Sequence, residues 1–314
     1  MPKKINKYGL SRNIPTDVAF EVRKRCGFGC VVCGNSIVDY DHYNPEFASC
    51  TEHQSDGIIL LCPTHHRTKG VFIAKQTMRK WVSNPFCTKY EYSHHPIDIQ
   101  NSEVKIGPYV ATDCPHVLRY GDHPIVWFEE PEAVGAPPRL NMIGKDKDGR
   151  KLFSIINNKW EASRNNFDVI MKRSGDVGII LVRDKSGYDI FNATYEDGAI
   201  NIWRLDIFAD ENVRIEADRN GESGSLKVNG RVVFSGSGNR VMRCPAAVVI
   251  GSDGSRSIAS RERFPENDRR RISRLLLRLV LGCHDTAGAA NLSPAALLQP
   301  PARFPKADKR RGIT

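Results

Sequence analysis

Four Cys and His residues near the start of the chain have the types and the spacing of a zinc site. Cys30 and Cys33 are separated by two residues, and so are Cys62 and His65. This spacing lets one tight turn direct both side chains of a pair at the same ion, and two pairs complete the tetrahedron that zinc prefers. Cys26 is a competing ligand, but its longer spacing to Cys30 favours a buried or free thiol. The sequence therefore predicts a structural zinc with three cysteine ligands and one histidine.

Three more side chains lie within or beside this motif and are suited to hydrolysis. Asp41 and His42 are adjacent, and His66 directly follows the zinc ligand His65. A carboxylate and an imidazole can hold a hard divalent cation and leave coordination positions open for water and phosphate oxygens. A second imidazole can deprotonate a water near neutral pH. Phosphodiester hydrolysis requires both a bound divalent cation and a general base, so these three residues suit that reaction.

Two short strands and a helix are expected to position these side chains. Residues 37–42 alternate apolar and polar as in a half-buried strand, and residues 57–61 form a second, apolar strand. Pro63 suits the first turn of a helix that carries His65 and His66. A zinc ion would tie the first cysteine pair to the start of this helix, so that His66 is held rigidly.

With these motifs in this order, residues 14–85 resemble an HNH endonuclease of the ββα-metal class, in the variety that carries a four-ligand zinc. The resemblance covers a little over a fifth of the chain. It implies that His42 is the general base and that Asp41 and His66 bind the catalytic ion, Mg²⁺, Mn²⁺ or another divalent cation. It also implies a metal-dependent endonuclease that hydrolyses phosphodiester bonds in DNA.

One position departs from the family pattern. The family has an Asn just before the second strand, where it braces the loop and orients the catalytic His, and the matching residue here is Gly57. Glycine has no side chain for that role. Asp56 or His53 could compensate, and His53 could alternatively be a third metal ligand or a plain loop residue.

The charge of the chain is concentrated at its two ends. Residues 1–90 carry 13 Lys and Arg against 7 Asp and Glu, and residues 251–314 carry 13 against 6, whereas residues 91–250 carry 20 against 23. Basic ends fit a polyanionic partner, and we expect nucleic acid, DNA in the first place. A basic surface with no partner is the alternative.

Four basic residues follow the metal motif on the expected helices. We expect them to contact the phosphates that flank the scissile bond, while a solvated helix face is the alternative. They are Arg67, Lys69, Arg79 and Lys80.

The rest of the chain reads as β structure followed by a tail. Turn pairs such as Asp197-Gly198 and Asn229-Gly230 separate short Val- and Ile-rich runs, which predicts an all-β, sandwich-like domain over residues 100–250. Residues 251–314 are basic and rich in Ala and Pro, and we expect them to be largely disordered. The predicted class is α+β, with a basic arm (1–13), a small zinc-stabilised ββα-metal (HNH) domain (14–90), the β domain and the tail.

Composition excludes some classes of protein and leaves others open. No apolar run approaches the roughly 20 residues that span a bilayer, so we expect no membrane partner. Nine cysteines, an odd number, favour metal binding in a reducing cytoplasm over a disulfide framework. Besides a nuclease whose β domain sets the target or partner, the sequence allows a zinc-stabilised nucleic-acid-binding module that has lost cleavage. An adaptor that acts through its β domain is a third reading.

Overall fold

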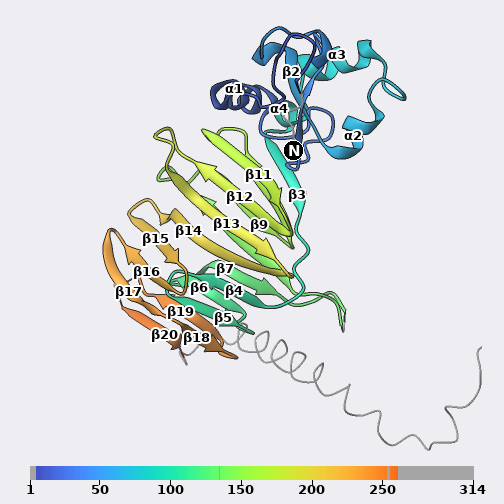
Figure 1. Ribbon diagram of the computed structural model, residues 1–314. Helices are drawn as coiled ribbons and strands as arrows, with labels where there is room; N and C mark the ends of the chain where they lie inside the picture. The colour runs from blue at the N-terminus through green and yellow to red at the C-terminus, as the bar shows by residue number, and fades with distance from the viewer. Residues whose placement is uncertain (1–4, 134, 253–254, 261–314) are drawn as a thin grey trace, which may run out of the picture.

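The computed structural model describes residues 5–133, 135–252 and 255–260. The described chain is mostly β structure with few helices, and the small N-terminal module stands at one end of two large sheets (Figure 1). Most of the predicted tail lies outside the described residues. The part of it that is described contains one strand, which extends the β structure past residue 250.

The N-terminal module contains four helices, two short 3-10 turns and a two-stranded antiparallel sheet. They are α1 (Thr16–Cys26), β1 (Asp39–His42), η1 (Phe47–Ser49), η2 (Ser55–Gly57), β2 (Ile58–Leu61), α2 (Pro63–Thr68), α3 (Lys75–Ser83) and α4 (Phe86–Tyr90). All four residues of β2 are buried, and they pack with Val22 of α1 and Met78 of α3. This small core fixes β2, and β2 in turn fixes β1 and α2.

Helix α1 is stabilised by charges that complement its dipole. Asp17 lies in the first turn, and Arg23, Lys24 and Arg25 lie in the last turn. Gly27 ends the helix in the left-handed conformation with φ of 69°, which glycine adopts without strain.

The first large sheet contains eight strands in the order β20-β19-β6-β7-β8-β9-β10-β3. Their bounds are β3 (Tyr92–Pro96), β6 (His116–Tyr120), β7 (His123–Glu129), β8 (Arg139–Lys145), β9 (Lys151–Ile156), β10 (Lys159–Ser163), β19 (Ala246–Ile250) and β20 (Arg256–Ser260). All neighbours are antiparallel except β19, which runs parallel to β6.

The second large sheet contains ten strands, seven of which follow one another as an antiparallel meander from β11 to β17. They are β11 (Asp168–Ser174), β12 (Val177–Arg183), β13 (Asp189–Glu196), β14 (Ala199–Asp210), β15 (Val213–Asn220), β16 (Ser223–Val228) and β17 (Arg231–Ser237). The other three are β4 (Glu103–Ile106), β5 (Tyr109–Thr112) and β18 (Asn239–Met242). Strand β4 joins them to the meander by pairing in parallel with β14.

The predicted turn pairs connect neighbouring strands. Asp197 and Gly198 have φ of 49° and 75°, and Asn229 and Gly230 have φ of 49° and 76°. Two consecutive positive φ values match the right-handed twist of the hairpin strands, and Asn, Asp and Gly adopt them at little cost.

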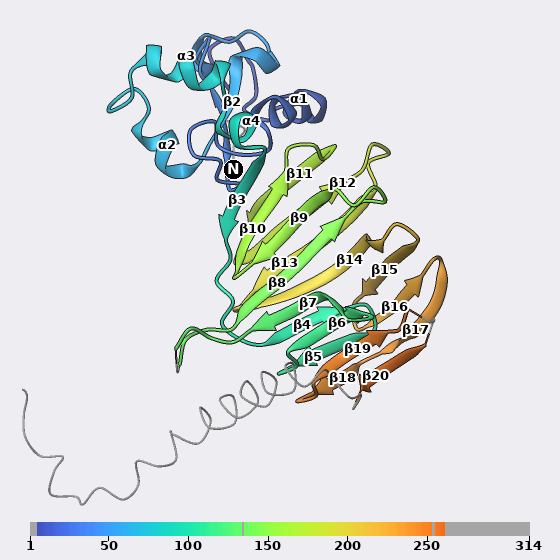
Figure 2. The same cartoon turned by 180° about the vertical axis from the view of Figure 1, so that it is seen from behind.

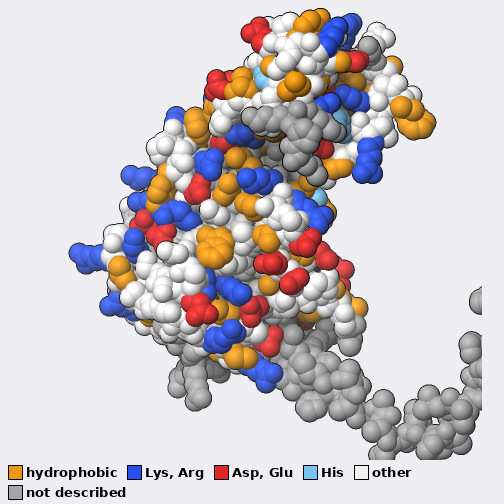
Figure 3. Space-filling model, viewed as in Figure 1, with side chains coloured by type: hydrophobic (Ala, Val, Ile, Leu, Met, Phe, Trp, Pro, Cys, Tyr) orange, Lys and Arg blue, Asp and Glu red, His pale blue; other side chains and the backbone are white. Residues whose placement is uncertain are grey.

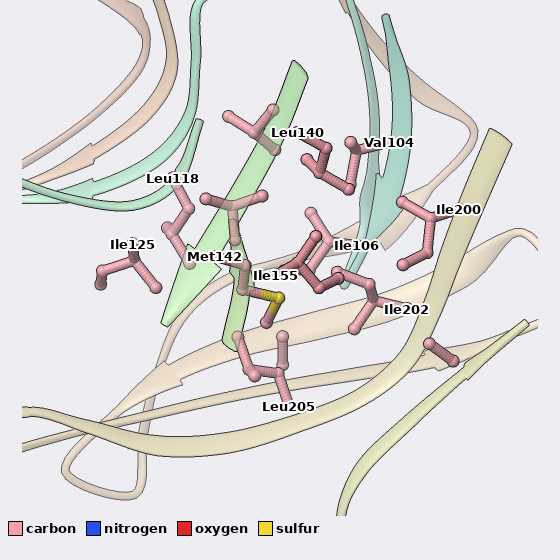
Figure 4. Packing of buried hydrophobic residues seen from close by; sticks show 14 of the residues in the cluster. Val104, Ile106, Leu118, Ile125, Leu140, Met142, Ile155, Ile200, Ile202 and Leu205 are labelled. Atoms are coloured by element: carbon pink, nitrogen blue, oxygen red, sulfur yellow. The ribbon is translucent and has the colours of Figure 1, made fainter. Parts of the chain in front are cut away.

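The two large sheets pack face to face across one apolar core. Figures 1 and 2 show the meander on one side and strands β7 to β10 on the other. Figure 4 shows Leu118 and Met142 of the first sheet beside Ile202 and Leu205 of the second. An aromatic stack also bridges the sheets, because Phe153 of β9 lies 4.4 Å from Phe191 of β13, centroid to centroid.

Several contacts attach the module to the β structure, among them two sets of hydrogen bonds. The Arg23 guanidinium donates to both Asp168 carboxylate oxygens, at 2.8 and 2.7 Å, and to the Tyr40 hydroxyl at 2.7 Å. On the other side, the His94 amide of β3 donates to the Gly34 carbonyl at 2.9 Å. Tyr40 precedes Asp41, so the first attachment reaches the strand that carries the metal motif.

No helix among the described residues is both long enough and apolar enough to cross a membrane.

Candidate metal centre and cleft

Strands β1 and β2 and helix α2 bring the predicted site residues together. Asp41 pairs with Ile59 and His42 with Ile58, so both residues lie on a strand whose partner is wholly buried. Pro63 is in the first turn of α2, as predicted, and Cys62 immediately precedes the helix. The buried strand therefore sets the position of β1 and of the start of α2 together.

The four predicted zinc ligands form one cluster. The ligand atoms of Cys30, Cys33, Cys62 and His65 all lie within 4.8 Å of one another. Cys33 Sγ is 3.9 Å from Cys62 Sγ, and Cys30 Sγ is 3.6 Å from His65 Nδ1. Two sulfurs on a tetrahedral zinc, each about 2.3 Å from it, are about 3.8 Å apart. The four predicted ligands thus form one cluster, whose ligand types and dimensions are consistent with a structural zinc site.

The thiols of the module divide into ligands and non-ligands. The pKa of Cys30 is lowered, chiefly by a hydrogen bond from Cys33, and a thiolate is the form that binds zinc. Burial raises the pKa of Cys26 to about 11, which keeps that thiol protonated. Cys26 is therefore a core residue, as its spacing to Cys30 indicated.

Asp41 and His66 meet at the mouth of a cleft beside this cluster. His66 Nε2 lies 3.3 Å from Asp41 Oδ1, and the same oxygen accepts the Lys69 ammonium. Asp41 is 5% exposed, and its second oxygen, Oδ2, is buried with no hydrogen-bond partner among the described residues. A buried carboxylate oxygen is stabilised by a donor or a cation. His66 contacts the other oxygen, Oδ1, so the carboxylate and the imidazole together offer donors of the kind that can hold a hard divalent cation.

His42 is held by a second histidine. His42 Nε2 lies 3.0 Å from His53 Nδ1, and His53 Nε2 lies 2.9 Å from the Ser11 carbonyl oxygen. Because a carbonyl only accepts, His53 carries its proton on Nε2, so its Nδ1 accepts from His42 Nε2 when both rings are neutral. This arrangement leaves the lone pair of His42 on Nδ1. Burial, followed by the nearby His53, lowers the pKa of His42, which favours the neutral ring.

Gly57 cannot be replaced by the family Asn in this backbone. A Cβ at this position would lie 2.5 Å from the Asn44 carbonyl oxygen, closer than van der Waals contact allows. The Gly57 carbonyl accepts the Tyr43 amide at 2.9 Å, so the segment after β1 lies directly against it. The close approach of the two loops requires glycine here.

Other residues brace the loops that the family Asn would brace. The Arg25 guanidinium donates to the carbonyls of Ser55 and Ile58, on both sides of Gly57. The Asn6 amide donates to the carbonyls of Phe47 at 2.8 Å and Cys50 at 2.7 Å. Residues 5–13, which belong to the predicted basic arm, are thus tied to the loop between β1 and β2.

The cleft has a volume of about 690 Å³, and the predicted hydrolytic residues are part of its lining. Asp41, His42 and His66 line it. Of the four predicted phosphate-contacting residues, Lys69 and Arg79 line it as well, whereas Arg67 and Lys80 are exposed outside the lining. Asp56 is exposed on η2 and outside the lining, so of the two residues considered to compensate for Gly57 only His53 reaches His42.

Sequence reasoning missed three features of this cleft. Arg12 lines it from the N-terminal segment, with its guanidinium 4.5 Å from the centroid of the Phe47 ring. Asp39 Oδ2 lies 3.6 Å from His66 Nδ1. Lys69, expected to face phosphate, contacts Asp41 instead. Strand alternation could have indicated Asp39, which is two residues from Asp41 and so on the same face, but no local pattern indicates the other two.

Comparison with known proteins finds no matching family model, no similar curated protein and no similar solved structure. The HNH resemblance therefore rests on the residues and on their geometry.

Proposed function

We propose that the chain is a metal-dependent endonuclease of the HNH, or ββα-metal, class that hydrolyses phosphodiester bonds in DNA. The observation that carries the proposal is the meeting of Asp41, His66 and His42 at one cleft, beside a Cys3His cluster. The order of β1, β2 and α2 supports the same class. The β structure would serve targeting or partner recognition, and the cytoplasm would keep the zinc thiolates reduced.

Each residue of the cleft has a role in this reaction. His42 Nδ1 would accept a proton from the attacking water, and His53 would hold the ring in the required tautomer and orientation. Asp41 and His66 would hold the divalent ion. When bound, this ion supplies positive charge to the scissile phosphate and the leaving oxygen. Arg12 and Arg79 would bind the flanking phosphates.

In this scheme the Cys3His cluster would have a structural role. His65 is a ligand of the cluster, and His66 is the next residue on the same short helix. A zinc ion with four protein ligands has no open position for substrate, so it serves structure and not chemistry. It would fix the start of α2, and through it the distance between His66 and Asp41.

The test is nicking of supercoiled plasmid DNA with Mg²⁺ or Mn²⁺. Wild-type protein should convert the plasmid to open circles, and His42→Ala should lose at least about a hundredfold in rate, since general-base catalysis contributes roughly 10²–10⁴-fold. His123→Ala, an exposed histidine of β7, is the matched control and should nick at the wild-type rate. Nicking by His42→Ala at the wild-type rate would contradict the assignment.

A second candidate function is nucleic-acid binding without cleavage. The contact between the Lys69 ammonium and Asp41 favours it, because a lysine can neutralise the carboxylate in place of a divalent ion. It predicts DNA binding that weakens with salt and no nicking with any divalent ion. Nicking that requires a divalent ion would reject it.

A further inference from the structure

Two apolar side chains project into solvent beside the cleft. Val71 is 75% exposed and Phe72 is 85% exposed, and both exceed every other large hydrophobic side chain that the structure describes as exposed. We call these two residues the apolar tip. Figure 3 shows hydrophobic side chains at the outer edge of the N-terminal module, over the α2–α3 connection and close to Lys and Arg side chains. A large apolar surface kept in water is unfavourable unless a partner covers it.

The backbone holds the apolar tip in a defined position. The Phe72 amide donates to the Thr68 carbonyl at 3.0 Å, and the Gly70 amide donates to the Ile73 carbonyl at 3.2 Å. Gly70 has φ of 75°, which permits the tight turn. Ile73 then packs against the core of the module. The tip is thus a hydrogen-bonded turn anchored at both ends.

The apolar tip adjoins the hydrolytic cleft. Gly70 and Ile73, which flank the tip on either side, both line the cleft together with His42 and His66. Val71 and Phe72 are not part of this lining, so a molecule in the cleft would meet the tip where it extends past Gly70 and Ile73.

The chain on both sides of the tip carries charge of one sign, although Asp41 of β1 and Glu46 after that strand also line the adjoining cleft. Residues 57–90, which include the helices on both sides of the tip, contain six Lys and Arg and no Asp or Glu. This combination of cations and an exposed aromatic ring matches a polymer with anionic backbone groups and flat apolar faces, which describes a nucleic acid. An acidic protein would supply the negative charge, but it would lack the regularly spaced flat rings that the bases of a nucleic acid provide.

From these observations we infer that Val71 and Phe72 form a wedge that enters the base stack next to the phosphate bound in the cleft. This inference rests on the proposed nuclease function and adds a substrate class to it. Apolar wedges separate neighbouring bases at a free-energy cost that is lowest where the stack is already weak. The substrate class is accordingly duplex DNA with a weakened stack, such as a single-base mismatch.

The test compares binding of full-length protein to two fluorescein-labelled duplexes, one fully paired and one with a single mismatch, without added divalent ion. Wild-type protein should bind the mismatched duplex more tightly. Phe72→Ala should weaken binding to it about tenfold, since stacking on one base is worth about that factor, while Phe72→Trp should retain it. A 2-aminopurine beside the mismatch should brighten with wild-type protein and stay dim with Phe72→Ala.

Two control variants separate the wedge from other effects. Val232→Ala removes an exposed hydrophobic side chain of β17, 52% exposed and in the β structure, and should leave both affinities unchanged. Arg79→Gln should weaken binding to both duplexes equally, because the contact proposed for Arg79 is with phosphate alone. Equal melting temperatures for Phe72→Ala and wild type show that the fold is intact.

Four results would overturn the inference, and they point to different causes. Equal affinities of Phe72→Ala and wild type for the mismatched duplex would overturn the wedge and leave the proposed nuclease function standing. Binding of wild type to neither duplex would overturn both. Phe72-dependent binding to phosphatidylglycerol vesicles with no duplex effect would assign the tip to a membrane surface. A Phe72-dependent dimer in light scattering, again with no duplex effect, would assign it to a second copy of the chain.

Discussion

The His42 ring is held by a chain of hydrogen bonds that ends at the Ser11 carbonyl. His53 forms the middle of this chain and so orients the ring in a module that has Gly57 where HNH endonucleases, which it resembles, have Asn. The two loops that meet at Gly57 leave no room for a Cβ, and Arg25 braces them from α1. At position 57 the close approach of the Asn44 backbone requires glycine, whatever role an Asn side chain would have there.

Replacing Gly57 with Asn should therefore lower the stability of the protein. The Cβ would meet the Asn44 carbonyl oxygen at 2.5 Å, and such overpacking costs about 1–3 kcal/mol. Urea unfolding of Gly57→Asn measures this loss. Gly178→Asn is the control, because a Cβ there meets Tyr195 at an ordinary 3.5 Å, and it should be destabilised less. Equal stability of Gly57→Asn and wild type would contradict the packing argument.

The zinc ligands also differ sharply from the neighbouring thiols. Cys62→Ala should lose the bound zinc and unfold the module at a lower temperature, because structural zinc binds with about 10–16 kcal/mol in small domains. Cys26→Ala, at a buried position outside the ligand set, should keep one zinc per chain. The zinc content of each variant, measured by mass spectrometry, shows which cysteine binds zinc. Loss of zinc in both variants would mean that Cys26 is a ligand.

At the scale of elements, the local sequence predicted the zinc ligands, α2 and β2. It did not predict the contacts between side chains of different elements. The Cys-x-x-Cys and Cys-x-x-His spacings are local, so the zinc ligands could be read directly. Pro63 and the apolar strand before it likewise indicated α2 and β2. The contact between Lys69 and Asp41 depends on the angle between α2 and β1, for which sequence periodicity gives no measure.

In the β sheets, too, the sequence predicted only pairing between neighbouring segments. Alternation and turn pairs predicted the hairpins of the meander, since each hairpin is formed by neighbouring segments. The parallel pairs β19 with β6 and β4 with β14 join strands that are far apart in the chain. No turn signal marks them, so the two-sheet architecture was predicted only as a class.

At the scale of the whole molecule, one buried ion pair connects the module to the β structure. The side chains of Arg23 and Asp168 are 12% and 6% exposed, and Arg23 also binds Tyr40, the neighbour of Asp41. The two partners are 145 residues apart in sequence, so nothing local indicated their pairing. Through this pair the β structure supports the strand that carries Asp41 and His42.

Breaking this pair should be costly, because Asp168 would remain buried without its partner. Arg23→Ala should lower the free energy of unfolding by about 3–5 kcal/mol. Arg173→Ala, which removes the exposed pair with Asp176, should cost less than about 1 kcal/mol. Chemical unfolding of both variants tests this difference, and equal losses would show that Arg23 does not anchor the module.

The most direct test of the central claim is the number of Mn²⁺ ions bound by the zinc-loaded protein, measured by electron paramagnetic resonance. It needs no knowledge of the preferred substrate. The account predicts one Mn²⁺ per chain in addition to zinc, with the Mn²⁺ lost in Asp41→Ala and the zinc retained. Absence of bound Mn²⁺ in the wild type, or equal binding by Asp41→Ala, would contradict the assignment of Asp41 and His66 as an ion site.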